Sequence, residues 1–218
     1  MSRQLAFDLP NAEAMTRDHF FVAPSNALAL QTVDRWQDWP GRKLLLVGPE
    51  GAGKTHLTHI WAARADAVIL SAADLGQTDI ARLSGRAVAV EDADRIGPAE
   101  AQLFHLHNLV TTTGALLLTA RTPPRDWGLS LPDLQSRMQA APIAHLDGPD
   151  DALLSAVLVK LFADRQVVVP ANLIPFLVSR MPRSIGAARA LVAALDARAL
   201  SEARPITRAL AADLLGAD

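Results

Sequence analysis

The chain has 218 residues, half of them hydrophobic, and its 21 basic residues nearly balance its 23 acidic ones. This composition supports a buried core and excludes a general polyanion-binding field, so no strong direct binding of DNA is expected. The absence of cysteine excludes disulfides and thiolate metal sites, and it is typical of the reducing cytoplasm.

The N-terminal residues predict a flexible arm and not a targeting segment. Residues 1–17 are polar around a short apolar motif, without the basic region and apolar core of a signal peptide. No apolar run approaches the roughly 18 residues that a membrane span needs. We therefore expect a soluble, cytoplasmic protein whose first domain begins near residue 18.

Strand and helix patterns alternate from residue 41 to residue 149. Five short apolar runs are typical of strands that are buried on both faces, namely residues 44–47, 67–70, 87–90, 115–119 and 142–146. A segment of helical character follows each run. This order predicts an α/β domain over residues 18–149, built on a five-stranded parallel sheet with helices on both faces.

A phosphate-binding loop follows the first run. Residues 48–55 complete the pattern G-x-x-x-x-G-K-T, as Gly48, Pro49, Glu50, Gly51, Ala52, Gly53, Lys54 and Thr55. Glycines let backbone N–H groups converge on a polyphosphate, the lysine reaches the outer phosphates, and the threonine hydroxyl takes a Mg²⁺ position. The helix expected over residues 55–64 adds its N-terminal dipole to the attraction for anions.

Two acids, Glu91 and Asp92, end the third run. The carboxyl ends of parallel strands face the ligand crevice in α/β proteins. Thirty-five residues or so after a phosphate loop, such a pair is expected to bind Mg²⁺ through Glu91 and to orient or deprotonate the attacking water through Asp92. A solvated turn is the alternative.

Two further residues are candidates for the same site. Thr119 ends the neighbouring run, where it either contacts the γ-phosphate or simply bonds to backbone. Arg137 lies on a short helix expected after the fourth strand. It either reaches the nucleotide of a neighbouring subunit as an arginine finger, which implies an oligomer, or is a surface arginine.

The strand pattern stops after residue 149, and a small all-helical domain is expected over residues 150–218. Helical stretches cover residues 150–165, 171–180, 184–202 and 207–215. Prolines stand at their boundaries, where proline opens or ends a helix.

Four blocks of sequence resemble the family of the bacterial replication initiator DnaA, and they occur in that family's order. They are residues 21–26, 51–59, 118–124 and 134–138. The resemblance covers residues 18–215 and implies an AAA+ P-loop NTPase core with a helical lid. It also implies that ADP or ATP is bound with Mg²⁺ by the loop residues, by His56 directly after them, and by Thr119.

The chain stops where DnaA continues into a helix-turn-helix DNA-binding domain. In this it is similar to the Hda regulators, which inactivate the initiator and bind the sliding clamp through an N-terminal peptide. Gln4, Leu5, Phe7 and Leu9 resemble that peptide, in which apolar side chains enter a groove and glutamine is a polar anchor. An arm that covers the chain's own core is the alternative.

The resemblance implies that the chain, tethered to the clamp, offers Arg137 to ATP held by DnaA and so limits initiation of replication. A helicase-loader-like AAA+ module is the alternative function. The chain departs from the family in its acids, which read Glu91-Asp92 in place of Asp-Asp or Asp-Glu, so the division of roles between them stays open.

A second departure concerns the lid. The family's sensor 2 arginine is expected after Ile185, where this chain has Gly186. Arg183 or Arg189 is the replacement, and we assign the phosphate contact to Arg183. If neither arginine replaces it, the phosphate contact is weakened, which favours an ADP-bound protein that hydrolyses ATP slowly by itself.

Overall fold

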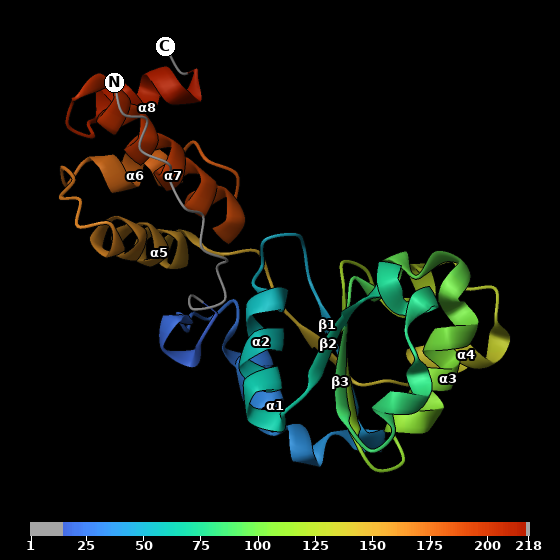
Figure 1. The fold of residues 1–218 in the computed structure, drawn as a ribbon. Helices are drawn as coiled ribbons and strands as arrows, with labels where there is room; N and C mark the ends of the chain where they lie inside the picture. Colours follow the sequence, from blue (N-terminus) through green and yellow to red (C-terminus); the bar gives the residue numbers. More distant parts are fainter. Residues whose placement is uncertain (1–14, 217–218) are drawn as a thin grey trace.

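The computed structural model describes residues 15–216, in which a layered α/β unit is followed by a cluster of helices (Figure 1). The predicted clamp-binding residues Gln4, Leu5, Phe7 and Leu9 lie outside the described residues. No helix within the described range is long and apolar enough to cross a membrane.

A five-stranded sheet forms the centre of the α/β unit. Its strands are β1 (Lys43–Val47), β2 (Val68–Ser71), β3 (Ala87–Glu91), β4 (Ala115–Ala120) and β5 (Ile143–His145). They are ordered β2-β3-β4-β1-β5, and every neighbouring pair is parallel. The predicted five-stranded parallel sheet is confirmed.

Helices cover both faces of this sheet, as expected from runs that are apolar at every position. One face packs against α1 (Ala27–Asp34) and α2 (Lys54–Ala65), and the other against α3 (Glu100–Val110) and α4 (Pro132–Gln139). Successive side chains of a strand point to opposite faces. Leu44 and Leu46 therefore enter one layer of core while Leu45 and Val47 enter the other.

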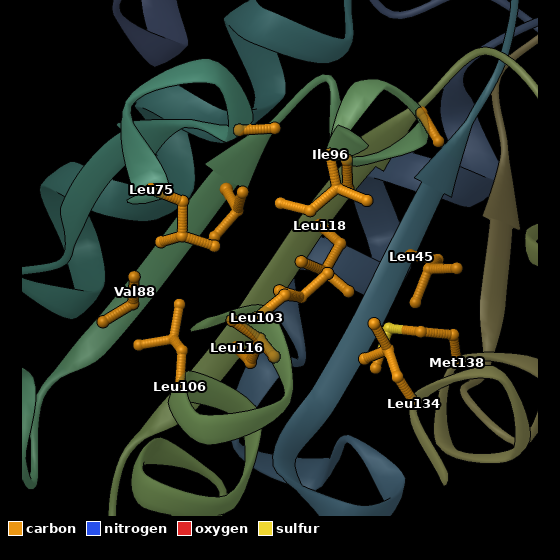
Figure 2. Packing of buried hydrophobic residues seen from close by; sticks show 14 of the residues in the cluster. Leu45, Leu75, Val88, Ile96, Leu103, Leu106, Leu116, Leu118, Leu134 and Met138 are labelled. Carbon is orange, nitrogen blue, oxygen red and sulfur yellow. The ribbon is translucent and has the colours of Figure 1, made fainter. Parts of the chain in front are cut away.

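The core on the α3 and α4 side is made of closely packed leucine, valine and methionine side chains. Figure 2 labels residues from the strands and from the covering helices that fill this layer, among them Leu45, Val88, Leu116, Leu118, Leu103, Leu106, Leu134 and Met138. Each of these eight side chains is fully buried. Burial of this kind is the main favourable contribution to folding and holds the strand ends in place.

The helical unit contains α5 (Asp151–Asp164), α6 (Leu173–Val178), α7 (Ile185–Glu202) and α8 (Arg208–Leu215). Three of these helices begin after a side chain that accepts a hydrogen bond from a backbone N–H of the first turn: Asp150, Ser184 and Thr207. Such caps satisfy N–H groups that the helix itself leaves without acceptors. The unit has its own buried core, which includes Leu154, Leu177 and Leu195.

The segment before α1 connects the two cores. Phe20 packs into the α/β core, whereas Ala23 packs into the core of the helical unit. Buried Asn26 fixes the turn between them, because its side chain accepts from the N–H of Ala23 and donates to the carbonyl of Phe21. The helical unit is therefore attached to the α/β unit in two places: the chain runs into it after β5, and the segment before α1 packs against it.

Lys43 and His107 meet at the amino end of β1. The distance from Lys43 Nζ to His107 Nε2 is 3.1 Å, and Lys43 also donates to the carbonyl of Arg137 at 2.9 Å. Burial lowers the pKa of His107 below 6.5, and the charge of Lys43 lowers it further, while a hydrogen bond to Asn108 acts in the opposite direction. Folding therefore favours the neutral imidazole.

A pH dependence of stability follows from this neutral histidine. Below about pH 6.5 the unfolded chain binds a proton at His107 that the folded chain resists, so the free energy of unfolding falls as the pH falls. Denaturant unfolding between about pH 7.5 and pH 5.5 measures the slope. We expect His107→Gln to reduce it, and His105→Gln, on the exposed side of the same helix, to retain it. An unchanged slope in His107→Gln would contradict the assignment.

Candidate functional site

The loop between β1 and α2 has a backbone shape that requires glycine. Gly51 and Gly53 have φ values of 76° and 102°, in the left-handed region that L side chains rarely adopt. Gly48 is also required, since a Cβ there would overlap the carbonyl oxygen of Leu146. These three glycines allow the loop to curl over the N-terminus of α2, where free N–H groups and the helix dipole favour an anion.

Lys54 closes the loop on itself. Its ammonium group donates to the carbonyls of Gly48 at 2.7 Å and Pro49 at 2.9 Å, and the residue is only 8% exposed. Burial lowers the pKa of Lys54, while the nearby carboxylates of Asp92 and Asp94 act in the opposite direction. The ammonium group of Lys54 is thus largely removed from water, and the partners named here for its hydrogen bonds are two uncharged backbone carbonyls of the loop.

The predicted acids and Thr119 come together at the carboxyl ends of β3 and β4. Asp92 lines the same cavity as the loop and has a φ of 55°. Its backbone N–H donates to the hydroxyl of Thr119 at 3.1 Å. Thr119 is 2% exposed, and the bond that its hydroxyl accepts joins the ends of β3 and β4. The carboxylate oxygen Oε1 of Glu91 is buried and has no partner among the described residues.

Arg121 is a site residue that our sequence analysis did not select. It follows β4 directly, lines the cavity of the loop, and pairs with Glu50 of the loop at 2.9 Å. Its backbone N–H donates to Asp94 at 3.2 Å. Its place directly after a strand of the predicted parallel sheet was a usable signal, because the carboxyl ends of parallel strands meet at one edge.

The helical unit of α5 to α8, which corresponds to the expected lid and is called the lid from here on, contacts the loop through the first turn of α7. The N–H of Ile185 donates to the carbonyl of Gly51 at 3.2 Å. Gly186 lines the cavity, and so does Arg189, which is half-buried. Arg183 is not brought to the site: it is 60% exposed and pairs with Asp151 of α5 at 2.8 Å.

Two adjoining cavities lie between the lid and the α/β unit. The first, of about 290 Å³, is polar and contains Lys54, Thr55, Asp92 and Arg121. The second, of about 270 Å³, has an apolar part formed by Phe20, Phe21, Leu153, Val157 and Leu161, and a charged part formed by Lys160, Asp164 and Arg165. His56, Ile185 and Arg189 line both cavities. A polar and an apolar cavity in contact suit a ligand with a charged end and a flat, uncharged end.

His56 joins the loop helix to the start of the described chain. Its Nε2 lies 2.9 Å from the carbonyl oxygen of Thr16, and its ring meets Phe20 edge to face at 5.1 Å between centroids. Burial lowers the pKa of His56, and the hydrogen bond that its ring donates to the carbonyl of Thr16 opposes this. The ring is therefore a neutral, fixed part of the wall between the two cavities.

Arg137 lies away from this site. Its carbonyl is bonded to Lys43 at the start of β1, whereas the loop follows the end of β1. Its guanidinium lies 5.4 Å from the centroid of the Phe104 ring, on the α3 side of the molecule. The predicted site residues thus fall into two groups at opposite ends of the sheet.

Gly51→Ala tests how closely the lid packs against the loop at Ser184. An added Cβ would overlap the hydroxyl oxygen of Ser184 and would strain a positive φ, so we expect the free energy of unfolding to fall by about 1–3 kcal/mol. Gly128→Ala is the matched control, because Gly128 has a φ of 67° with open space around its Cβ position. Denaturant unfolding should show the larger loss for Gly51→Ala; equal losses would mean that Ser184 yields without cost.

Comparison with known proteins places the fold. No protein-family model matches the chain. An alignment 231 residues long shows 27% identity to the chromosomal replication initiator protein DnaA of Thermomicrobium roseum. The alignment covers 92% of this chain and 49% of that protein. The chain therefore spans about half the length of this curated relative.

Solved structures agree with that relative. Domain III of DnaA from Thermotoga maritima superposes with a TM-score of 0.80 at 17% identity, over 93% of this chain and 95% of that one. AMPPCP-bound DnaA from Aquifex aeolicus gives 0.73 at 16% identity, over 90% and 68%. A RuvB variant from Thermotoga maritima gives 0.69 at 17% identity, over 93% and 71%. The chain therefore has the fold of DnaA domain III.

Proposed function

We propose that this protein is an adenine-nucleotide-binding regulator of replication initiation of the Hda type, which stimulates ATP hydrolysis by DnaA. The observation that carries the proposal is the separation of two functions on one chain. A complete phosphate cradle lies at the carboxyl edge of the sheet, and Arg137 lies at the opposite edge, where it is free to serve the nucleotide of another protein.

The cradle supports binding of ADP or ATP. Lys54 and Arg121 supply positive charge in the polar cavity, and the free N–H groups at the start of α2 point to the same place. The apolar part of the cavity beside it, which Phe20, Phe21 and Leu153 help to form, has the chemistry for a purine base. Relatives of this fold include a DnaA bound to AMPPCP, an ATP analogue.

The residues present also fit Mg²⁺. Thr55 and Asp92 line the polar cavity. Glu91 does not line it, but it precedes Asp92 directly and has a buried carboxylate oxygen without a partner among the described residues. Oxygen ligands of this kind suit Mg²⁺, which when bound neutralises charge between phosphates. In this proposal Thr55 and Glu91 hold the ion, and Asp92 positions a water molecule.

Arg137 cannot serve the nucleotide of its own chain. Its backbone is fixed to Lys43, and β1 extends from Lys43 to Val47 before the loop begins, a distance of about 13 Å at a rise of about 3.3 Å per residue. Packing on Phe104 keeps its guanidinium on the outside of the α/β unit. An arginine in this position is suited to stabilise charge on ATP held by an adjacent AAA+ protein.

The proposal includes the sliding clamp as a partner. Gln4, Leu5, Phe7 and Leu9 form the peptide for the clamp groove, and the described chain begins beside the nucleotide cavity, which Met15 lines. In this arrangement the clamp holds the protein on DNA, and Arg137 is presented to DnaA. Self-association and a weak ATPase activity of the chain itself belong to the same proposal.

Arg137→Ala tests the central part of this function. Hydrolysis of labelled ATP by DnaA is measured with DNA-loaded clamp and each variant. Removal of an arginine finger lowers such transfers on the order of 10³-fold, so stimulation should disappear, and Arg137→Lys should recover little because it lacks the planar fork. Arg82→Ala, a change at an exposed arginine paired with Asp79, is the control. Normal stimulation by Arg137→Ala would refute the proposal.

The double substitution Gln4→Ala with Leu5→Ala tests the arm. It removes the polar anchor and one apolar contact of the peptide, so we expect clamp binding to be lost in a pull-down or surface-binding assay. Nucleotide binding should be retained, since both residues precede the described site. Undiminished clamp binding would remove the tether from the proposal, and capture of a replicative helicase by the protein would favour a loader.

A further inference from the structure

Two exposed arginines of the lid share one aromatic ring. The guanidinium carbon of Arg180, just after α6, lies 4.2 Å from the centroid of the Phe176 ring, and that of Arg208, the first residue of α8, lies 4.7 Å from it. The helices α6 and α8 contact each other in the lid (Figure 1). The two guanidinium groups are therefore no more than about 9 Å apart, close to the Debye length of about 8 Å at physiological ionic strength, so salt screens their mutual repulsion only in part.

Neither of these arginines forms an ion pair within the part of the chain that the structure describes. The guanidinium of Arg180 donates a hydrogen bond to the uncharged hydroxyl of Ser179 at 3.0 Å. Other arginines of the lid do have acidic partners: Arg165 pairs with Asp196, Arg183 with Asp151, and Arg198 and Arg204 with Glu202. Two cations at one ring thus depart from the charge pairing found elsewhere in the lid.

The N-terminus of α8 adds to the positive potential around Arg208. The helix dipole places a partial positive charge there, where a further cation is unfavourable and an anion is favourable. The first turn of α8, which the structure describes in full, contains no acidic residue, and its capping residue Thr207 is uncharged. An anion beside Arg208 would therefore be attracted by two guanidinium groups and by the helix N-terminus together.

The Phe176 ring holds the two cations and leaves them able to bind a ligand. The ring is 7% exposed and belongs to the core of the lid, so its position is fixed. An arginine that lies over an aromatic ring still has N–H groups in the plane of its guanidinium for other partners. A carboxylate has two oxygens, which one guanidinium can satisfy, whereas a phosphate has oxygens enough for two. A pair of arginines therefore favours phosphate over carboxylate.

We propose that Arg180, Arg208 and the N-terminus of α8 form a phosphate-binding site on the lid that is separate from the nucleotide cleft. Among the described residues that line the two cavities of the cleft, neither arginine is found. The phosphate belongs to a free anion or to a nucleic-acid backbone, since both present the same oxygens. Two cations give only weak binding, in agreement with the nearly balanced charge of the whole chain.

Thermal unfolding in inorganic phosphate, compared with chloride at the same ionic strength, tests the site with a free anion. Lys54→Ala is the background, so that phosphate at the glycine loop contributes little. We expect phosphate to raise the unfolding midpoint of this background through binding. Arg180→Gln and Arg208→Gln should each weaken the apparent phosphate affinity on the order of 10-fold, because a charge-assisted hydrogen bond is lost.

Arg204→Gln is the matched control, because this exposed arginine of the lid is paired with Glu202, and it should bind phosphate as the background does. Phosphate also stabilises folded proteins by exclusion from their surface, an effect that all variants share. Glutamine retains part of the aliphatic stem that covers Phe176, which limits the loss of stability. In the wild-type protein, the NMR signals of the Nε–H groups of Arg180 and Arg208 should shift with phosphate, a measurement that needs no substitution.

Fluorescence anisotropy of a labelled DNA duplex tests the site with a nucleic-acid backbone. Two phosphate contacts predict that the logarithm of the binding constant falls with the logarithm of the salt concentration at a slope of about −2. Arg180→Gln and Arg208→Gln should each reduce the magnitude of this slope by about one, and Arg204→Gln should leave it unchanged.

The two assays separate the sources of the phosphate. Binding of inorganic phosphate without binding of the duplex assigns the site to a free anion, and binding of the duplex with the expected slope assigns it to a backbone. The inference is overturned if the signals of both arginines stay unshifted and both glutamine variants match their parent proteins in the two assays. It is also overturned if a polyglutamate peptide binds at these arginines and neither form of phosphate does.

Discussion

The parallel arrangement of β3, β4 and β1 is the constraint on which the rest of this structure depends. Their register sets Val90 beside Leu118 and Val47 beside Ala120, so the three strands end along one edge. Everything that follows a strand there is brought to the same place: the loop after β1, the acids after β3 and Arg121 after β4. Burial of both faces of the sheet fixes the register of the strands, because a one-residue slip would move every side chain of a strand from one core layer into the other.

The second determinant is the contact between the lid and the loop. One backbone hydrogen bond joins Ile185 to Gly51, and the absence of a side chain at Gly51 lets Ser184 approach. This close approach turns an open sheet edge into a cleft with two walls. The segment that carries Phe20 and Ala23 packs on both units, so the position of the lid is also set from the other end of the domain.

Positive charges are divided between the two edges of the sheet, one group at the cleft and the other at the amino ends of the strands. Lys54, Arg121 and Arg189 surround the cleft, whereas Lys43 and Arg137 lie at the amino edge of the sheet. A cation at the cleft is desolvated and suited to hold a ligand. Arg137, packed on Phe104, faces outward and is suited to act on a second protein. In the proposed function, the same sheet holds one nucleotide site and presents Arg137 to the nucleotide of another protein.

The sequence by itself determined the α/β class, the five strands, the glycine loop and the acids at the end of β3, because these follow from local rules of spacing and hydrophobic pattern. It placed the helices of the lid for the same reason. The tertiary structure decided the strand order, the roles of Thr119 and Arg121 at the shared edge, and which lid arginine faces the cleft. The sequence analysis considered both Arg183 and Arg189 and assigned the contact to Arg183, whereas in the structure Arg183 pairs with Asp151 at the surface and Arg189 lines the cleft. Directions of long side chains depend on neighbours that are distant in the chain, and only folding brings those neighbours together.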